Sequence, residues 1–189
     1  MSPLHSPRRR SRSRADLVRA GLAGKGTFSG GAIAGAGYIP AVSVILASAL
    51  GTLPIVSVTG WWPNFGFLVL IAWRLLRADP WPAWWAAPMG FANDLLTGAP
   101  IGLSVALWSA VMLAMELVDR RTEWRDYWVE WAIAIVLISV DRWADWQVAG
   151  LAGAPVPFVQ IVPAIVIGIL AFPLAAWIVS RTDRWRTGR

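Results

Sequence analysis

The sequence contains no cysteine and a single histidine, His5, among its 189 residues. The absence of thiols excludes disulfides, a thiolate nucleophile and cysteine-ligated metal sites. His5 lies in the N-terminal tail, so histidine-based acid–base catalysis and histidine metal sites are excluded elsewhere. Charge is also scarce, because only 15% of the residues are charged and 57% are hydrophobic, whereas a soluble domain carries about 25% charged residues. One domain-sized unit is expected at this length, and its shortage of polar residues favours an outer surface that faces lipid.

The first 38 residues differ in composition from the rest of the chain. An Arg- and Ser-rich run, Ser6–Arg14, is followed by glycine-rich sequence up to Gly37. We expect residues 1–38 to form a disordered basic tail. The tail is not typical of a signal peptide, because no compact apolar run follows the arginines closely. Such a run can bind nucleic acid, but we expect instead a tail that its charge keeps on the cytoplasmic side, without a nucleic-acid partner.

A series of apolar segments fills residues 39–180. The first segment has no charged residue and is long enough to cross a hydrocarbon layer of roughly 30 Å, with Pro54 kinking or fraying its outer end. The third is only about 20 Å long as a helix, so the third and fourth segments either span the membrane or form a re-entrant hairpin. The sequence therefore predicts an all-α integral membrane protein, a six-helix transmembrane bundle. The expected segments are Ile39–Thr59, Pro63–Arg77, Trp84–Leu96, Ile101–Val118, Tyr127–Trp146 and Pro157–Ser180.

The basic residues predict the orientation of this bundle. With both termini cytoplasmic, six spans leave Arg142 as the only one of the 17 Lys and Arg residues on the outer side, as the positive-inside rule requires. Residues 181–189 then form a basic cytoplasmic C-terminus. Arg74 is expected to extend to the membrane interface and Asp119 to be a solvated or locally paired charge. Many of the 14 tryptophans flank segment boundaries, where tryptophan anchors helices at the headgroup level.

Asp94 is the most informative single side chain. A carboxylate in or near hydrocarbon must be paired, hydrated or protonated. Two interpretations are open. Asp94 is an intramembrane ligand, proton site or helix-packing anchor, or it lies at the outer helix end and caps the next turn in contact with water. The glycines around it are expected to permit close helix packing, and a hairpin turn with proline at the following helix start is expected after it. The other residues singled out in this stretch are Gly90, Asn93, Gly98, Pro100 and Gly102.

A second polar cluster, Asp141, Arg142 and Asp145, lies near the outer end of the fifth segment. The two carboxylates are four residues apart and share a helix face. They could form a catalytic pair or an outward-facing substrate site, but an interfacial ion cluster or a partner contact is the favoured interpretation. The sequence contains no Gly-rich phosphate loop, no metal-ligand spacing and no serine nucleophile with a suitable base. We therefore expect no enzymatic activity and no cofactor.

The stretch around Asp94 resembles a pattern of the rod shape-determining protein MreD family. In that family Gly…Asp-Leu-Leu-x-Gly-x-Pro-x-Gly lies between the third and fourth segments. Here it is matched by Gly90, Asp94-Leu95-Leu96, Gly98, Pro100 and Gly102. The resemblance implies a location in the bacterial inner membrane and a fold similar to the substrate-binding components of energy-coupling-factor vitamin transporters.

The same resemblance implies a function and partners. It implies a non-enzymatic scaffold of the elongasome, the assembly that supports side-wall peptidoglycan synthesis and cell shape. The implied partners are MreC and, directly or through MreC, RodA and its transpeptidase. The similarity of fold leaves an alternative open, a substrate-binding membrane subunit of a small-molecule (vitamin-type) transporter. That function requires a cavity lined by polar side chains, for which the segments offer few candidates beyond Asn93, Asp94 and Gln160.

Overall fold

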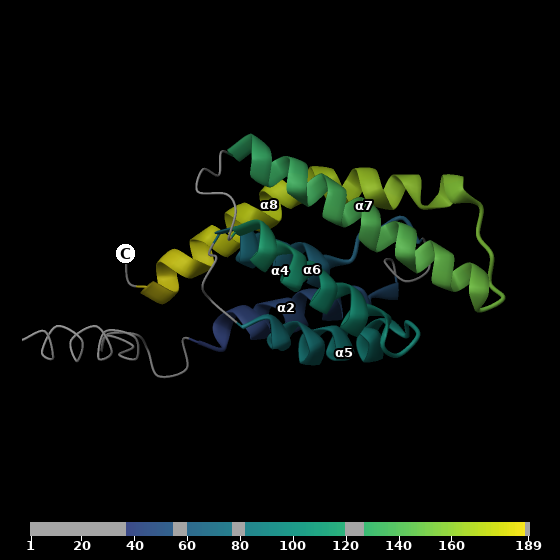
Figure 1. Cartoon of the computed structure of the whole chain (residues 1–189), viewed down its shortest axis with the longest axis horizontal. Coiled ribbons are helices and arrows are strands. Elements are labelled where there is room, and N and C mark those ends of the chain that lie inside the picture. The colour runs from purple at the N-terminus through teal and green to yellow at the C-terminus, as the bar shows by residue number, and fades with distance from the viewer. Residues whose placement is uncertain (1–36, 55–59, 77–81, 120–126, 188–189) are drawn as a thin grey trace, which may run out of the picture. The chain divides into compact units, whose positions relative to one another are not determined.

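The computed structural model describes residues 37–54, 60–76, 82–119 and 127–187. Among these residues every regular element is helical, so the prediction of an all-α fold with six helices is confirmed (Figure 1). The Arg-rich run, Trp81 and Trp124 lie outside the described residues. The α-helices are α2 (Ile39–Leu50), α4 (Phe65–Leu76), α5 (Ala86–Thr97), α6 (Leu103–Asp119), α7 (Tyr127–Leu151) and α8 (Val162–Thr187), and the short 3₁₀ turns Ala83–Trp85 and Phe158–Gln160 precede α5 and α8.

The helices differ in their capacity to cross a membrane. Within the described residues one helical stretch, Phe158–Trp185, is long and apolar enough to do so by length and composition. The apolar helices α2 and α4 have 12 residues each, which gives about 18 Å per helix. The first expected segment, Ile39–Thr59, with Pro54 kinking or fraying its outer end, is interrupted earlier than expected, because α2 ends at Leu50 in a turn. Pro54 has no N–H to donate to the Leu50 carbonyl, and it disfavours helical geometry at the residue before it.

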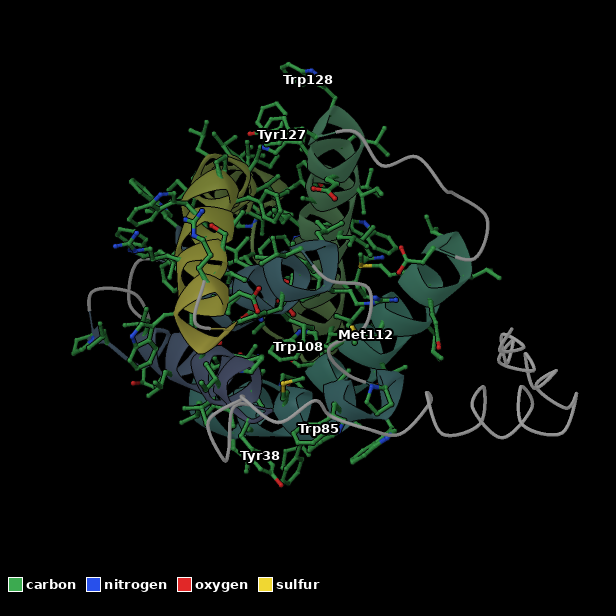
Figure 2. The ribbon with its side chains drawn as sticks, turned by 90° about the vertical axis from the view of Figure 1, so that its left-hand side faces the viewer. Tyr38, Trp85, Trp108, Met112, Tyr127 and Trp128 are labelled. Atoms are coloured by element: carbon green, nitrogen blue, oxygen red, sulfur yellow. The ribbon has the colours of Figure 1, made fainter. Side chains whose placement is uncertain are left out.

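The core is built around α4, which packs against α2, α7 and α8. Nearly all of its side chains are buried, including Trp73. The indole N–H of Trp73 donates to Ser43 Oγ on α2 at 2.8 Å. Figure 2 shows Trp108 of α6 lying among the helices, and Trp108 is fully buried. Trp128 of α7, in contrast, projects outward and is 71% exposed. The tryptophans are therefore divided between core packing and exposed positions.

Two helix pairs flank this core. The helices α5 and α6 form a tightly packed hairpin. The long helices α7 and α8 also contact each other and are drawn in green and yellow in Figure 1. α8 continues past Ser180, where the last apolar segment was expected to end, as far as Thr187.

Contacts between helix termini define two ends of the bundle. At the first, which we call the Arg74 end, the rings of Tyr38 and Trp85 lie 6.0 Å apart at the starts of α2 and α5 (Figure 2). At the same end Arg74 Nη2 lies 2.6 Å from Asp119 Oδ2, which joins the last turns of α4 and α6. Arg74 is 4% exposed, so its guanidinium is buried beside Asp119 within the bundle. Its helix is the central one, and its neighbours cover the last turn.

The opposite end, which we call the Arg142 end, contains the C-terminus of α2, the start of α4, the turn between α5 and α6, and the second half of α7. These parts line one pocket. The start of α4 is fixed there by Asn64, whose Oδ1 accepts the N–H of Phe67 at 3.2 Å. Neighbouring helices from α2 to α6 consequently alternate in direction between the two ends.

Candidate functional site

Asp94 fixes the start of α6. Its Oδ2 accepts the N–H of Gly102 at 2.8 Å, and its Oδ1 accepts the N–H of Ser104 at 3.0 Å. The first N–H groups of a helix have no partner within the helix, and a carboxylate there also interacts favourably with the helix dipole. Of the two interpretations of Asp94, the geometry supports capping. The expected contact with water is absent, because Asp94 is 1% exposed.

The glycines of this stretch have two different roles. A Cβ on Gly90 would lie 2.7 Å from the carbonyl carbon and oxygen of Ser104, so α5 and α6 approach each other closely at Gly90. The expectation of close packing is wrong for Gly98 and Gly102, where an added Cβ would meet nothing within 4 Å. These two glycines instead have positive φ angles of 69° and 101°, which glycine adopts at little steric cost. Gly98 thereby ends α5 in the left-handed conformation common at helix C-termini.

Asn93 and Pro100 complete the hairpin between α5 and α6. Asn93 is buried, and its Nδ2 donates to Ser104 Oγ at 2.9 Å. The Pro100 carbonyl accepts the N–H of Leu103 at 3.1 Å. Pro100 therefore lies in the turn before α6 and not at the first helical position expected for it. Each residue of the stretch thus has a defined place in one helical hairpin.

Arg142 bridges the two carboxylates of α7. Its Nη2 lies 2.7 Å from Asp141 Oδ2 and 2.5 Å from Asp145 Oδ2, and its Nε donates to Asp141 Oδ2 at 3.1 Å. The side chain of Asp141 is only 4% exposed, against 16% for Arg142 and 35% for Asp145. The members of the predicted outer-face cluster become progressively more exposed from Asp141 to Asp145. Arg142 and Asp145 line the pocket at the Arg142 end.

This pocket brings together residues that are far apart in the sequence. It has a volume of about 320 Å³, which lies at the lower end of the range for small-molecule sites. Its polar side chains come from α2, the start of α4, α5, α6 and α7. They are Ser48, Asn64, Asn93, Ser104, Arg142 and Asp145.

Two of these side chains have a buried polar atom without a hydrogen-bond partner, Ser48 Oγ and Asn93 Oδ1. Ser48 is 2% and Asn93 is 1% exposed. Both atoms lie next to Gly66 of α4, because a Cβ on Gly66 would clash with Ser48 Oγ and lie 3.2 Å from Asn93 Oδ1. Buried polar atoms are nearly always hydrogen-bonded in proteins, so these two mark a place where the pocket can accept an external partner.

The sequence reasoning identified Asn93, Arg142 and Asp145 but not their convergence, and it missed Ser48 and Ser104. A serine within an apolar helix is a weak signal, because it often bonds only to its own backbone. Gln160, also considered as a cavity residue, is exposed in the turn before α8 and does not line the pocket. Among the described residues no group of acidic side chains could hold a metal ion.

Comparison of the chain with protein-family models, with curated proteins and with solved structures found no match in any of the three.

Proposed function

We propose that this chain is a non-enzymatic membrane scaffold of the rod-shape complex, a member of the MreD family that binds MreC and supports side-wall peptidoglycan synthesis. The observation that carries the proposal is the structural role of the stretch from Gly90 to Gly102, which resembles the MreD-family pattern. Asp94 caps α6, Gly90 permits close contact between α5 and α6, and Gly98 and Gly102 adopt positive φ angles. Every one of these roles is structural, as expected of a motif that builds a hairpin in a scaffold.

Exposed apolar side chains support a lipid environment for this scaffold. The long helix α8 exposes Leu170, Leu174 and Trp177 at 59–69% of their surface. A soluble monomer rarely exposes a contiguous apolar surface of this kind. We therefore place the protein in the bacterial inner membrane as a multi-pass protein.

The alternation of helices between the Arg74 end and the Arg142 end supports the orientation. The proposed cytoplasmic side is the Arg74 end, with both chain termini on that side. The hairpin of α5 and α6 starts at the Arg74 end and has its turn at the Arg142 end, beside the pocket. The 12 residues of α5 extend about 18 Å, the same length as α2 and α4.

RodA and its transpeptidase are proposed as further partners, directly or through MreC. The test is mass spectrometry of the proteins that co-purify with the tagged full chain after gentle extraction from its native membrane. The same tag on an unrelated multi-pass protein is the control. Recovery of an MreC-like protein with RodA and a transpeptidase is the expected result. Recovery of a pair of ATPases with a membrane coupling protein would overturn the scaffold proposal in favour of transport.

The pocket is the one observation that favours this second candidate, a substrate-binding subunit of a vitamin-type transporter. A transporter subunit requires a cavity lined by polar side chains, and a pocket of about 320 Å³ with two unpartnered buried polar atoms fits that requirement. The composition of the co-purified assembly distinguishes the two candidates, whatever the pocket holds.

A further inference from the structure

The Asp141–Arg142–Asp145 cluster beside the pocket carries an unbalanced charge. Arg142 carries one positive charge, and the two carboxylates that it bridges, Asp141 and Asp145, carry two negative charges. The cluster therefore has a net charge of −1 when all three groups are ionised. Asp145 is the carboxylate nearest to solvent and lines the pocket, whereas Asp141 is buried behind it. A cation is the ligand that the net negative charge of this cluster favours.

The hydrogen-bonding groups of the pocket also select a class of ligand. Asn93 already uses its amide nitrogen to donate to Ser104 Oγ, so its unpartnered atom is an acceptor. The unpartnered hydroxyl of Ser48 can accept a hydrogen bond as well. Both atoms are buried, and an acceptor left without a partner in that position is destabilising. A ligand that supplies N–H donors removes this deficit, and one without donors does not.

We propose that the pocket binds a primary ammonium group, carried by a small amine or by the headgroup of an amine-bearing lipid. Its N–H donors satisfy Asn93 Oδ1 and Ser48 Oγ, and the Asp141–Arg142–Asp145 cluster balances its charge. The volume of about 320 Å³ accommodates a headgroup-sized molecule. This inference concerns the pocket alone and is independent of the choice between scaffold and transporter.

The experiment measures thermal unfolding of the purified, delipidated full chain in detergent through its intrinsic fluorescence, which the 14 tryptophans make strong. The probes are ethanolamine and phosphatidylethanolamine. Choline and phosphatidylcholine are the matched controls, because each carries a quaternary ammonium group that lacks N–H donors. Ligand that binds only the folded state raises the unfolding temperature in a concentration-dependent way. We expect the unfolding temperature to rise with ethanolamine or phosphatidylethanolamine and to change little or not at all with the trimethylated counterpart.

The same comparison identifies the source of the ammonium group. If both ethanolamine and phosphatidylethanolamine raise the unfolding temperature, a free amine suffices. If the lipid alone raises it, the ligand is a lipid headgroup. Equal shifts with ethanolamine and choline, and with the two lipids, would overturn the proposal, as would the absence of any shift with all four probes.

Three variants test the location of the site. Ala149→Leu fills the pocket from α7, whereas Ala132→Leu adds the same bulk at an exposed position of the same helix. We expect Ala149→Leu to abolish the ammonium-dependent shift and Ala132→Leu to retain it. Asp145→Asn removes the charge nearest the pocket and should weaken binding about tenfold, the value of one charge-assisted hydrogen bond. Unchanged binding in Ala149→Leu would contradict the assignment.

Ser48→Ala separates ligand binding from a purely structural role. Removing a buried hydroxyl that has no partner should raise the unfolding temperature of the ligand-free protein. The same change removes one acceptor for the ligand, so the shift caused by ethanolamine or phosphatidylethanolamine should become smaller. A Ser48→Ala protein that is less stable without ligand, or that keeps the full shift, would overturn the assigned role of Ser48.

Discussion

The two ends of the bundle use the same charged groups in opposite ways. At the Arg74 end the Arg74 guanidinium lies 2.6 Å from Asp119, and this ion pair joins two helices. At the Arg142 end one guanidinium meets two carboxylates of its own helix, next to a pocket with unpartnered buried atoms. An ion pair between two helices serves to hold the fold together. An unbalanced cluster beside a cavity has charge and hydrogen-bonding capacity left over for a ligand.

The largest expected effect comes from removing the two guanidinium groups. Arg142→Met leaves the buried Asp141 and its neighbour Asp145 without a counter-ion, and loss of one partner from a buried ion pair costs about 3–5 kcal/mol. Arg74→Met should lower the free energy of unfolding by less, because the side chain of Asp119 is 16% exposed and can be hydrated. The free energies of unfolding in a denaturing-detergent titration provide the measurement.

A double substitution sharpens this prediction. Arg74→Met with Asp119→Leu replaces the whole pair by apolar groups and should recover most of the stability lost in Arg74→Met alone. At the other end, Arg142→Met with Asp145→Leu still leaves Asp141 unpaired and should recover less. Equal recovery at the two ends would contradict the distinction between an ion pair that joins two helices and a cluster of two carboxylates and one guanidinium within one helix.

The next largest effect is expected at Asp94. Asp94→Leu leaves the N–H groups of Gly102 and Ser104 without their acceptor, at a cost of about 2–4 kcal/mol for two such groups. Asp94→Asn keeps one acceptor oxygen and should lose about half as much. The same denaturation measurement applies. If the capping bonds make no net contribution, Asp94→Leu will match the wild type.

Asp94→Leu is also expected to weaken association with MreC without preventing membrane insertion. Membrane fractionation and co-purification of the variant measure these two effects separately. Full retention of MreC binding and of cell shape would count against a role of the α5–α6 hairpin in the scaffold.

The smallest effects are expected at the glycines, and they should differ in kind. Gly90→Ala forces a Cβ against the Ser104 backbone and should cost about 1–3 kcal/mol by overpacking. Gly102→Ala meets no neighbour but must keep a φ of 101°, for which a cost of about 1 kcal/mol is expected. Gly102→Leu should then cost little more than Gly102→Ala, since there is space for the larger side chain. A much larger loss for Gly102→Leu would indicate a close contact.

The sequence predicted the helices better than their ends. Uninterrupted apolar runs located all six, because burying apolar surface is what places a segment in the interior or in lipid. The end of α2 at Leu50 was missed, since the unbroken apolar pattern from Ile39 to Thr59 outweighed the effect of Pro54. Local turn chemistry overrode hydrophobic length there.

The site was predicted only in its separate parts. Asp94 and Asp145 stand out because charge within apolar sequence is unusual. Their helices meet through tertiary packing, however, and nothing in the sequence near Asp145 indicates that it shares a pocket with Asn93. The same reason explains why the Arg74–Asp119 pair was not foreseen. Its partners are on different helices and each looks like an ordinary helix-end charge.

The proposed topology places the Arg74 end and the Arg142 end on opposite sides of a membrane. The absence of native cysteine makes single-cysteine labelling the most direct test. Tyr38→Cys reports on the Arg74 end and Leu151→Cys on the Arg142 end, and both positions are exposed. In intact cells a membrane-impermeant maleimide should label Leu151→Cys. It should label Tyr38→Cys only after the membrane has been permeabilised. Labelling of both positions from the same side would contradict this topology.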